Sequence, residues 1–561
     1  MYFIKIESNY IRYVLIGKFI ICEIPNENLE IQIKNKREDI IIETDYNQFL
    51  ILKNKKSFLI ESENYIRKMW FCKIISNEEI FNINPNFQII EKFNHIPYVN
   101  IIYGRCNDSM IFLDKLYRNY ITKHKFENNQ IVAIKSVAGS GKTTTLLELS
   151  KIHNKKKILY IAFNKSLITE IKEKIKKNNI KNLFPYTFDS LMREIFIIKN
   201  NIEILDIIDL KSNNIGNILN WFQNKPYRVK NYYIKNFSNF CNQIEYNDIN
   251  TYSEKVLGNK KNLLEEMWKK VLNYELITFD SIRKLVFINR LCLDIIDKKY
   301  DLIFIDESQD FDNVMLKILL RDTILPKLFV GDPLQAIYEW KGCINAFDKL
   351  PESSLIFEFY STFRVGNPAC DLISNLFYNC NMISKSSNIT NLKYDIVPTV
   401  KYTYLFRNWR NLLQTAQFIE NIWINNYDSQ IKYIRLLHDK VKKFGFNNDD
   451  YDEFSDDLPK FLLKLSMEEL EKMINNIEKN ISKKEESKVE FYTIHTYKGL
   501  ENDVVRIYND IDIENEPNLH YVALTRAKKL VIIDSRIPIY DQNILNNDRK
   551  KQLYFTNNNF S

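Results

Sequence analysis

Four residues close to position 140 of the chain have the types and spacing needed to bind a polyphosphate. They are Gly139, Gly141, Lys142 and Thr143, within the segment AIKSVAGSGKTTT. Glycines let backbone N–H groups close around phosphates, a lysine reaches the β- and γ-phosphates, and a threonine hydroxyl ligates Mg²⁺. Ser136 stands where the general pattern G-x-x-x-x-G-K-[ST] has glycine, a small departure because serine is also compact. The motif therefore predicts a site for a nucleoside triphosphate and Mg²⁺.

A carboxylate pair follows a second apolar run. In YDLIFIDESQDF, Asp306 and Glu307 come directly after a strand-like stretch. This position suits two roles for a carboxylate pair, one residue binding a water on the metal and the other acting as a base that aligns the attacking water. In LFVGDPLQAIYEWKG, Gln335 is placed to reach a γ-phosphate. The same segment offers Tyr338 and Trp340 as base-stacking faces, although two such aromatic residues alone would more often belong to a core.

The elements around these residues read as alternating strands and helices. Residues 131–134 form an apolar strand before the glycine-rich loop, and residues 157–163 form a second strand, followed by a helix over 166–176. This alternation is typical of doubly wound α/β domains. A second α/β unit is indicated by four later segments, which are STFRVG, YLFRN, TIHTYKGLE and LHYVALTRAK.

The rest of the chain divides by composition. Period-2 patterning over the first 100 residues predicts a small β-rich domain, and helix-like stretches predict two insertions. The expected domains are 1–105, β-rich; 106–200 with 286–352, the first α/β domain; 201–285, a helical insertion; 353–424 with 489–540, the second α/β domain; 425–488, a helical accessory insertion; and 541–561, a mobile tail.

Composition sets broad limits on what the protein can be. Of its 561 residues, 45% are hydrophobic and 27% charged, which excludes disordered and collagen-like chains, and the net charge of +8 permits nucleic-acid binding without demanding it. Eight cysteines without a C-x-x-C pair predict buried free thiols in a reducing compartment. The first residues lack a signal-peptide core, and no run reaches 18 apolar residues. We expect a soluble intracellular protein, cytoplasmic or nuclear, that does not bind membranes.

Taken together and in this order, the motifs resemble those of superfamily 1 helicases of the UvrD/Rep type. The matching segments are AGSGKTT, AFNKS, TFDSL, DESQD, GDPLQAIYEW, TFR, TIHTYKGLE and YVALTRA. AFNKS, TFDSL and STFRVG are most like the F-box DNA helicase branch, although the sequence holds no evident F-box. The resemblance implies two RecA-like domains, ATP and Mg²⁺ as cofactors, and 3′ to 5′ movement along single-stranded DNA, with single-strand/double-strand junctions as partners.

The resemblance also implies roles at the nucleotide. Asp306 would hold the metal through water, Glu307 would activate the hydrolytic water, and Arg364 and Arg526 would act as arginine fingers. Phe363 stands where the family usually has a tyrosine that stacks on adenine. The implied catalytic residues are Lys142, Glu307, Gln335, Arg364 and Arg526, and the implied metal ligands are Thr143 and Asp306. The implied ATP-binding residues are Ala138, Gly139, Ser140, Gly141, Lys142, Thr143, Thr144, Phe363 and Glu501, the last at the ribose.

On the nucleic-acid side, the resemblance implies aromatic residues that stack on bases and polar residues that contact phosphates. The implied DNA-binding residues are Phe163, Thr187, Tyr338, Trp340, Thr493 and His495. A lone histidine is usually a core or surface residue, and His495 is included because of its place in TIHTYKGLE.

Two departures from the family pattern leave alternatives open. The glutamine that usually reads adenine about 20 residues before the phosphate loop is missing, since Gln130 is too close to that loop. The short interval between Arg364 and Thr493 implies a reduced accessory domain. The alternatives are a nucleic-acid-stimulated ATPase that does not separate strands or that acts on RNA, and an inactive nucleic-acid-binding module. The β-rich region could bind a protein partner or support the core.

Overall fold

The structure of the chain is a computed structural model. It describes residues 114–534 with short gaps, together with the backbone of eight strands between Tyr2 and Ile90. The gaps are residues 115–116, 204, 209–214, 216–217, 220–221, 223–226, 259–261, 340–341, 378–379 and 445–456. Two compact units are present. The first comprises Met1–Lys123, Ile131–Ile134 and Pro351–Phe359, and the second comprises His124–Gln130, Lys135–Leu350 and Tyr360–Ser561.

In the first unit, eight short strands precede residue 91. Six of them form an antiparallel sheet in the order β6-β7-β3-β2-β1-β8, and β4 pairs with β5. Because most of residues 1–113 lie outside the described part of the chain, the predicted β-rich domain and its role toward a protein partner stay predictions. The strands are β1 (Tyr2–Lys5), β2 (Tyr13–Ile16), β3 (Phe19–Ile24), β4 (Ile40–Glu43), β5 (Gln48–Ile51), β6 (Ser57–Ile60), β7 (Lys68–Lys73) and β8 (Gln88–Ile90).

The phosphate-loop strand belongs to a six-stranded sheet with the order β11-β10-β12-β13-β9-β14. Its strands β10 (ILYIA) and β12 (LIFI) are buried along their whole length, as expected for parallel strands covered on both faces. β10 pairs in parallel with both β11 and β12, and β12 pairs in parallel with β13. The strands are β9 (Ile131–Ser136), β10 (Ile158–Ala162), β11 (Leu183–Thr187), β12 (Leu302–Ile305), β13 (Lys327–Gly331) and β14 (Leu355–Phe359).

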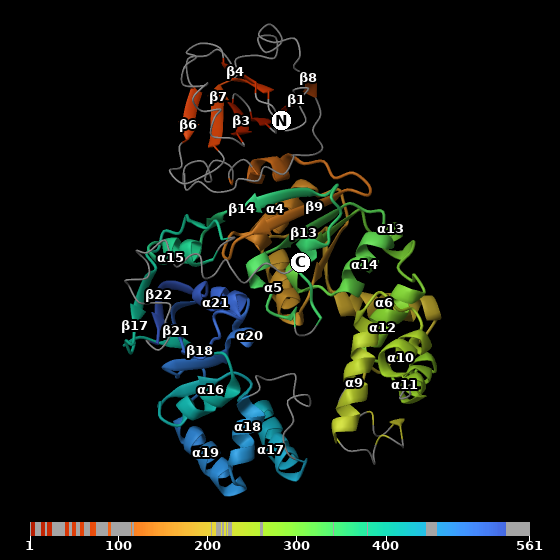
Figure 1. Cartoon of the computed structure of the whole chain (residues 1–561), viewed down its shortest axis with the longest axis vertical. Helices are drawn as coiled ribbons and strands as arrows, with labels where there is room; N and C mark the ends of the chain where they lie inside the picture. The colour runs from red at the N-terminus through yellow and green to blue at the C-terminus, as the bar shows by residue number, and fades with distance from the viewer. Residues whose placement is uncertain are drawn as a thin grey trace. The chain divides into compact units, whose positions relative to one another are not determined.

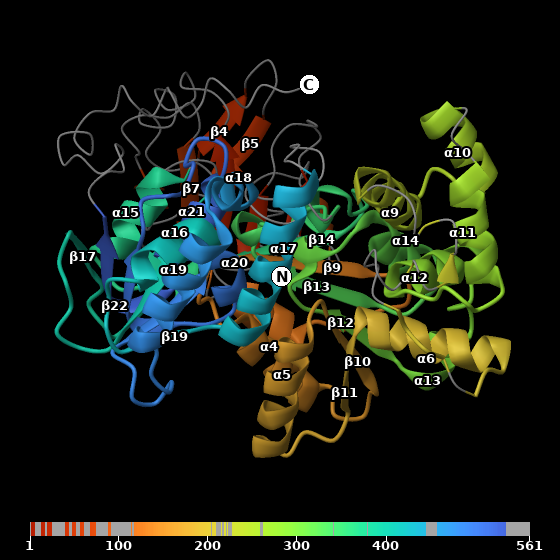
Figure 2. The same ribbon diagram turned by 90° about the horizontal axis from the view of Figure 1, so that it is seen from below.

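The helices that alternate with these strands begin at capped positions. α5 starts after Asn164, whose side chain accepts a hydrogen bond from Leu167 N at 2.9 Å, and α6 starts after Thr187 in the same way. The predicted alternation of strand and helix is therefore present here, and α5 packs against β10 and β11 (Figure 2). The helices are α4 (Lys142–Ile152), α5 (Lys165–Lys177), α6 (Phe188–Asn200) and α14 (Asn313–Arg321).

Residues 201–285 carry several described helices joined by turns, while the predicted helical insertion with these bounds stays a prediction. Figure 1 shows α9, α10, α11 and α12 together as one yellow-green group, and α12 packs against both α6 and α9. The helices are α9 (Tyr227–Asn242), α10 (Ile249–Leu257), α11 (Asn262–Leu272), α12 (Phe279–Ile288) and, after them, α13 (Ile295–Lys299).

A second six-stranded sheet has the order β17-β22-β21-β18-β20-β19, and all five of its strand pairs are parallel. The predicted α/β class with two parallel sheets is therefore confirmed. Its strands are β17 (Asn391–Tyr394), β18 (Tyr402–Phe406), β19 (Ile422–Ile424), β20 (Val489–Thr493), β21 (Asn502–Ile507) and β22 (Ala527–Ile533). The neighbouring elements are β15 (Ser361–Thr362), β16 (Ile383–Ser384), α15 (Ala369–Leu376), α16 (Trp409–Ala416), α20 (Ile494–Tyr497) and α21 (Pro517–Leu524).

The predicted accessory insertion, 425–488, shares one hydrophobic core with this sheet. Ile434 and Ile474 of the insertion lie in the same buried cluster as Phe406 and Phe491 of the strands. The helices are α17 (Tyr427–Phe444), α18 (Asp457–Lys464) and α19 (Met467–Asn480). In the described part of the chain this segment is thus built onto the second sheet, while the predicted domain boundaries themselves stay predictions.

Two expectations drawn from composition can be compared with the described residues. The five cysteines whose side chains are described are all buried, as predicted: Cys241, Cys292, Cys343, Cys370 and Cys380. Among the described helices, none has the length and apolar character needed to cross a membrane.

Candidate active site

The glycine-rich loop connects β9 to α4 and has the backbone that the motif requires. Gly139 and Gly141 both have positive φ, at 71° and 82°, a region that favours glycine. A Cβ on Gly139 would also lie 2.5 Å from Cβ of Arg364, so no side chain fits there. Ser136, at the unusual first position, donates from its hydroxyl to the Gly331 carbonyl at 2.9 Å. The departure from glycine thus ties the end of β9 to the end of β13.

Two segments that neighbour the second sheet, the turn after β15 and the helix α21, contact this loop directly. Phe363 N donates to the Gly139 carbonyl at 2.8 Å, and Ala138 N donates to the Tyr521 hydroxyl at 3.0 Å. That hydroxyl donates in turn to Oδ2 of Asp332 at 3.1 Å. Val137 and Ala138 also lie in the hydrophobic cluster that surrounds Tyr521. The loop is therefore held between the two sheets.

The carboxylate pair comes directly after β12, as predicted. Asp306 is buried, and its carboxylate accepts from Tyr160 Oη at 2.5 Å and from Glu307 N at 2.9 Å. Burial, followed by the charge of Glu307, raises the pKa of Asp306 to about 6. The hydrogen bond from Tyr160 and the charge of Lys142 lower this pKa and only partly offset the rise. The residue after it has a left-handed backbone, with φ 50° at Glu307, which turns the chain at the end of the strand.

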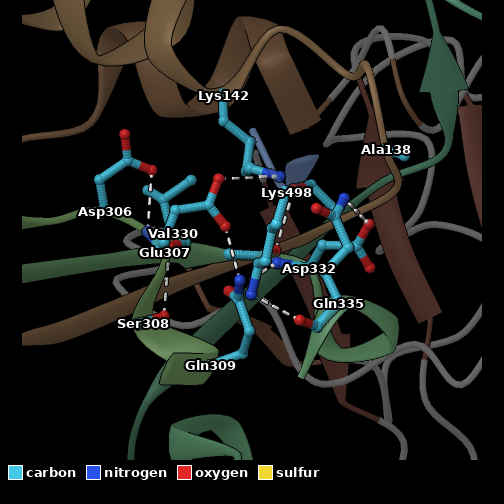
Figure 3. A network of polar contacts seen from close by, with 12 residues as sticks. Ala138, Lys142, Asp306, Glu307, Ser308, Gln309, Val330, Asp332, Gln335 and Lys498 are labelled. Carbon is cyan, nitrogen blue, oxygen red and sulfur yellow. Dashed lines mark hydrogen bonds and ion pairs between the residues drawn. The ribbon is translucent and has the colours of Figure 1, made fainter. Parts of the chain in front are cut away.

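Glu307 points toward the lysine of the phosphate loop. Its Oε1 lies 3.8 Å from Lys142 Nζ, and Gln309 Nε2 donates to its Oε2 at 2.5 Å (Figure 3). Burial alone would raise the pKa of Glu307, but Lys142, Lys498 and the Gln309 hydrogen bond hold it below its ordinary value. The carboxylate therefore stays ionised, which is the state that a residue needs to orient and deprotonate water.

Gln335, after β13, meets an arginine of the second sheet. Its Nε2 donates to Asp332 Oδ2 at 2.7 Å, and its Oε1 accepts from Arg526 Nη2 at 3.2 Å. Arg526 is 1% exposed, and burial, followed by the charge of Arg364, lowers its pKa to about 10. The structure thus brings together two residues that the sequence places 191 positions apart.

The other predicted arginine, Arg364, lies against the predicted ribose residue. Its Nε donates to Glu501 Oε2 at 2.6 Å, and Lys528 forms a second ion pair with Glu501 at 2.7 Å. Burial raises the pKa of Glu501, but Arg364 and Lys528 together hold it below its ordinary value. Phe363, next to Arg364 in sequence, is 52% exposed. Its ring lies beside the phosphate loop, because a Cβ built on Gly141 would be 4.0 Å from two of its ring carbons.

The donor set at the carboxylate end suits a hard cation. Thr143 lies in the first turn of α4, where its hydroxyl oxygen, like the Asp306 carboxylate, is the kind of ligand that Mg²⁺ prefers. Within the described residues, no group of three or more histidine, cysteine, aspartate or glutamate side chains could hold a metal alone. This pattern fits Mg²⁺, which usually keeps several waters and takes substrate phosphates as its remaining ligands. Of the other predicted loop residues, Ser140 is buried and Thr144 is exposed.

Three of the predicted strand-contacting residues lie together. The rings of Phe163 and Tyr338 are stacked, with centroids 6.0 Å apart and an angle of 23° between planes. Tyr338 also lies 6.1 Å from the His495 ring and donates from its hydroxyl to the His495 carbonyl at 3.1 Å. Lys498 Nζ lies 4.9 Å from the centre of the Tyr338 ring. Stacked rings beside a cation are typical of a surface that takes bases and phosphates.

The remaining predicted contacts have local roles. Thr187 accepts from Ser190 N at 3.1 Å and so caps α6, and Thr493 shares a hydrogen bond of 3.0 Å with Thr496. Trp340 lies outside the described residues.

Several residues that complete this network were assigned no role from the sequence, although all of them lie inside or beside motifs that were recognised. The clearest is Lys498, whose Nζ lies 2.6 Å from Asp310 Oδ2 and donates to the Gln335 carbonyl at 2.6 Å. Their signal in the sequence was a polar side chain within an apolar run or within a recognised motif. The residues are Tyr160, Gln309, Asp310, Asp332, Lys498 and Tyr521.

Two family models and several curated relatives match parts of this chain. The family model of the UvrD/REP helicase N-terminal domain matches residues 118–350, and that of the viral superfamily 1 RNA helicase core domain matches residues 425–534. F-box DNA helicase 1 of Gallus gallus is 25% identical over 506 residues, covering 74% of this chain and 48% of the relative. F-box DNA helicase protein 1 of Schizosaccharomyces pombe is 24% identical over 507 residues, covering 74% and 57%.

The chain spans about half the length of these curated relatives. Among solved structures, a crystal structure of Arterivirus nonstructural protein 10 (helicase) covers 97% of this chain and 77% of its own, with 9% identity and a TM-score of 0.31. A TM-score this low carries no argument about function.

Proposed function

The chain belongs to the superfamily 1 helicases of the UvrD/Rep type, and from this membership we propose that it hydrolyses ATP to move 3′ to 5′ along single-stranded DNA and to open duplexes. The observation that carries the proposal is the meeting of Arg526 with Gln335. Arg526 lies between α21 and β22, next to the second sheet, and Gln335 lies after β13 of the first sheet. A nucleotide bound at the phosphate loop would therefore be contacted by residues from both sheets.

In this proposal each residue acts on ATP from a fixed position. Lys142 neutralises the β- and γ-phosphates, and Glu307 orients the attacking water and accepts its proton. Arg364 and Arg526 stabilise the charge that develops as the γ-phosphoryl group is transferred. Mg²⁺, held through Thr143 and through water on Asp306, would supply further neutralisation of phosphate charge.

Movement follows from the two-sheet arrangement. ATP binding favours close contact between the sheets because it gives the arginines an anionic partner, and hydrolysis weakens that contact. Phe163, Tyr338 and His495 would grip bases of any sequence, since stacking contributes roughly 1–3 kcal/mol per base. A base-pair step costs on the order of 1.4 kcal/mol to open, so one ATP per step is energetically sufficient.

The experiment measures ATPase rate with and without single-stranded DNA, together with unwinding of duplexes that carry a 3′ or a 5′ single-stranded tail. Stimulated hydrolysis and unwinding only of 3′-tailed duplexes are expected, and both should vanish in Glu307→Gln while ATP binding persists. Unwinding of 5′-tailed duplexes would overturn the polarity, and unstimulated hydrolysis would overturn the translocase.

RNA is a second candidate strand, because the model that matches residues 425–534 is that of an RNA helicase core. The same assay with single-stranded RNA and RNA duplexes separates the two. Stronger stimulation and unwinding with RNA than with DNA would replace the DNA proposal, and stimulation without unwinding of either would indicate a translocase that does not separate strands.

A further inference from the structure

Tyr160 is a tyrosine in the middle of an otherwise apolar, fully buried strand. β10 reads ILYIA, and Tyr160 is 1% exposed. A buried tyrosine hydroxyl needs a hydrogen-bond partner, and this one donates to Oδ2 of Asp306 at 2.5 Å. Tyr160 and Phe304 are register partners of the parallel strands β10 and β12, and Asp306, two residues after Phe304, directly follows β12. The contact therefore joins two neighbouring strands at the edge where the proposed metal ligand lies.

The second oxygen of Asp306 is also held. Its Oδ1 accepts from the backbone N–H of Glu307 at 2.9 Å, so the carboxylate has one fixed donor on each oxygen. Figure 3 shows Asp306 beside Glu307, with this hydrogen bond between them. A carboxylate accepts about four hydrogen bonds or metal contacts in all, so each oxygen keeps a lone pair for a metal-bound water. The two donors fix the plane of the carboxylate without using up its acceptor capacity.

We propose that Tyr160 is a positioning residue for Mg²⁺, holding the Asp306 carboxylate in the orientation that receives the metal-bound water. The inference rests on the proposed function, because it assumes that Asp306 faces Mg²⁺ on ATP. Partners that orient a metal ligand typically contribute a factor of about 10–100 in metal affinity. Tyr160 does not contact the nucleotide in this role, so the affinity for nucleotide without metal is unaffected.

A purely structural role for the hydroxyl makes a different prediction, and the chain offers a matched control. Tyr404, in the central strand β18, is 3% exposed and donates to Oδ2 of Asp534 at 2.6 Å. Tyr404 thus resembles Tyr160 in its burial, in its place in a parallel strand and in donating to an aspartate carboxylate. Its partner Asp534 follows β22, at the opposite end of that strand from Arg526. Tyr160→Phe and Tyr404→Phe delete one hydroxyl each, and only the first should alter metal binding.

The experiment measures binding of a fluorescent, non-hydrolysable ATP analogue while Mg²⁺ is titrated, and binding of Mn²⁺ to the same complex by electron paramagnetic resonance. The half-saturating metal concentration should rise about 10–100-fold in Tyr160→Phe and stay at the wild-type value in Tyr404→Phe. Affinity for the analogue in EDTA should be equal in all three proteins, which also shows that the variants are folded.

Asp306→Asn and the double variant Tyr160→Phe/Asp306→Asn test whether Tyr160 acts through Asp306. The double variant should bind metal no more weakly than Asp306→Asn alone, because the orienting hydroxyl then has no carboxylate to hold. An unchanged metal requirement in Tyr160→Phe, or additive losses in the double variant, would overturn the inference. If added metal left the affinity of the wild-type protein for the analogue at its value in EDTA, the proposed function would be overturned instead, so the two failures are distinguishable.

Discussion

Nη2 of Arg526 donates to Oε1 of Gln335 at 3.2 Å, and the guanidinium is fully buried. Its Nε also donates to the carbonyl of Val522 in α21 at 2.8 Å, so the helix that precedes Arg526 fixes the direction of its side chain. A buried arginine costs desolvation free energy, and burial lowers its pKa to about 10. Among the described residues, Glu307 and Asp332 offset the positive charge of Arg526 only in part. A bound γ-phosphate would give this charge an additional anionic partner.

Arg526→Ala should lower the DNA-stimulated ATPase rate by about 10³-fold or more, as losses of arginine fingers do. Binding of a non-hydrolysable ATP analogue should persist, because Lys142 and the loop backbone are intact. Arg506→Ala is the control, since Arg506, in β21, is a partly buried arginine, and its ion pair with Asp534 at 2.7 Å involves no predicted site residue. Near-normal turnover in Arg526→Ala, or an equal loss in Arg506→Ala, would refute the finger.

Lys498→Met should destabilise the fold by about 3–5 kcal/mol, because it leaves Asp310 as an uncompensated buried charge. The side chains of Lys498 and Asp310 are 8% and 4% exposed, and their closest atoms are 2.6 Å apart. Lys529→Met removes one partner of an exposed pair with Asp503 and should cost less than about 1 kcal/mol. Urea unfolding measures both.

A double-mutant cycle then tests the coupling. Lys498→Met/Asp310→Asn should recover much of the loss, because the unpaired charge is gone. Losses that simply add in the double variant would show that the two residues act independently.

Gly139→Ala should abolish most nucleotide binding and lower thermal stability. Gly342→Ala should leave nucleotide binding unchanged and lower thermal stability only slightly. Both glycines have positive φ, 71° and 82°, so alanine strains both backbones by about 1–2 kcal/mol. Only Gly139 has atoms close enough to clash, with Arg364 Cβ 2.5 Å and Thr362 Oγ1 2.8 Å from a built Cβ. Nucleotide titrations and melting curves compare the two variants, and equal effects would show that backbone strain alone is at work.

His520 should make the protein less stable in acid. Burial lowers its pKa to about 3, against about 6.5 in the unfolded chain, so the unfolded state binds more protons between these values. Its contribution to stability is complete above pH 6.5 and is lost as the pH falls through this window. Between pH 7 and pH 5 the loss is about 2 kcal/mol.

The measurement is the difference between wild type and His520→Asn in urea midpoint at pH 7 and pH 5. This difference isolates the histidine, because the buried aspartates Asp306, Asp310 and Asp312, whose pKa burial raises to about 6, act in the opposite direction in both proteins. The wild type should lose more stability than the variant on acidification. Equal losses would mean that His520 is not the group responsible.

The sequence by itself determined the local chemistry. A glycine-rich loop needs positive φ at Gly139 and Gly141, and the chain has glycine there. An apolar run that ends in Asp306 and Glu307 places both carboxylates at a strand end, because buried parallel strands are apolar along their length and stop where polar residues begin. These features depend on neighbours within a few positions, so a pattern in the sequence is enough to predict them.

Only the tertiary structure decided which distant residues meet. Tyr160 donates to Asp306 across 146 positions, and Lys498 pairs with Asp310 across 188. Nothing local marks these pairs, since a tyrosine in an apolar strand or a lysine in a motif has many conceivable partners. The partner is selected by strand order and by the packing of the two sheets, which bury these groups and so require each to find an opposite charge or a hydrogen bond.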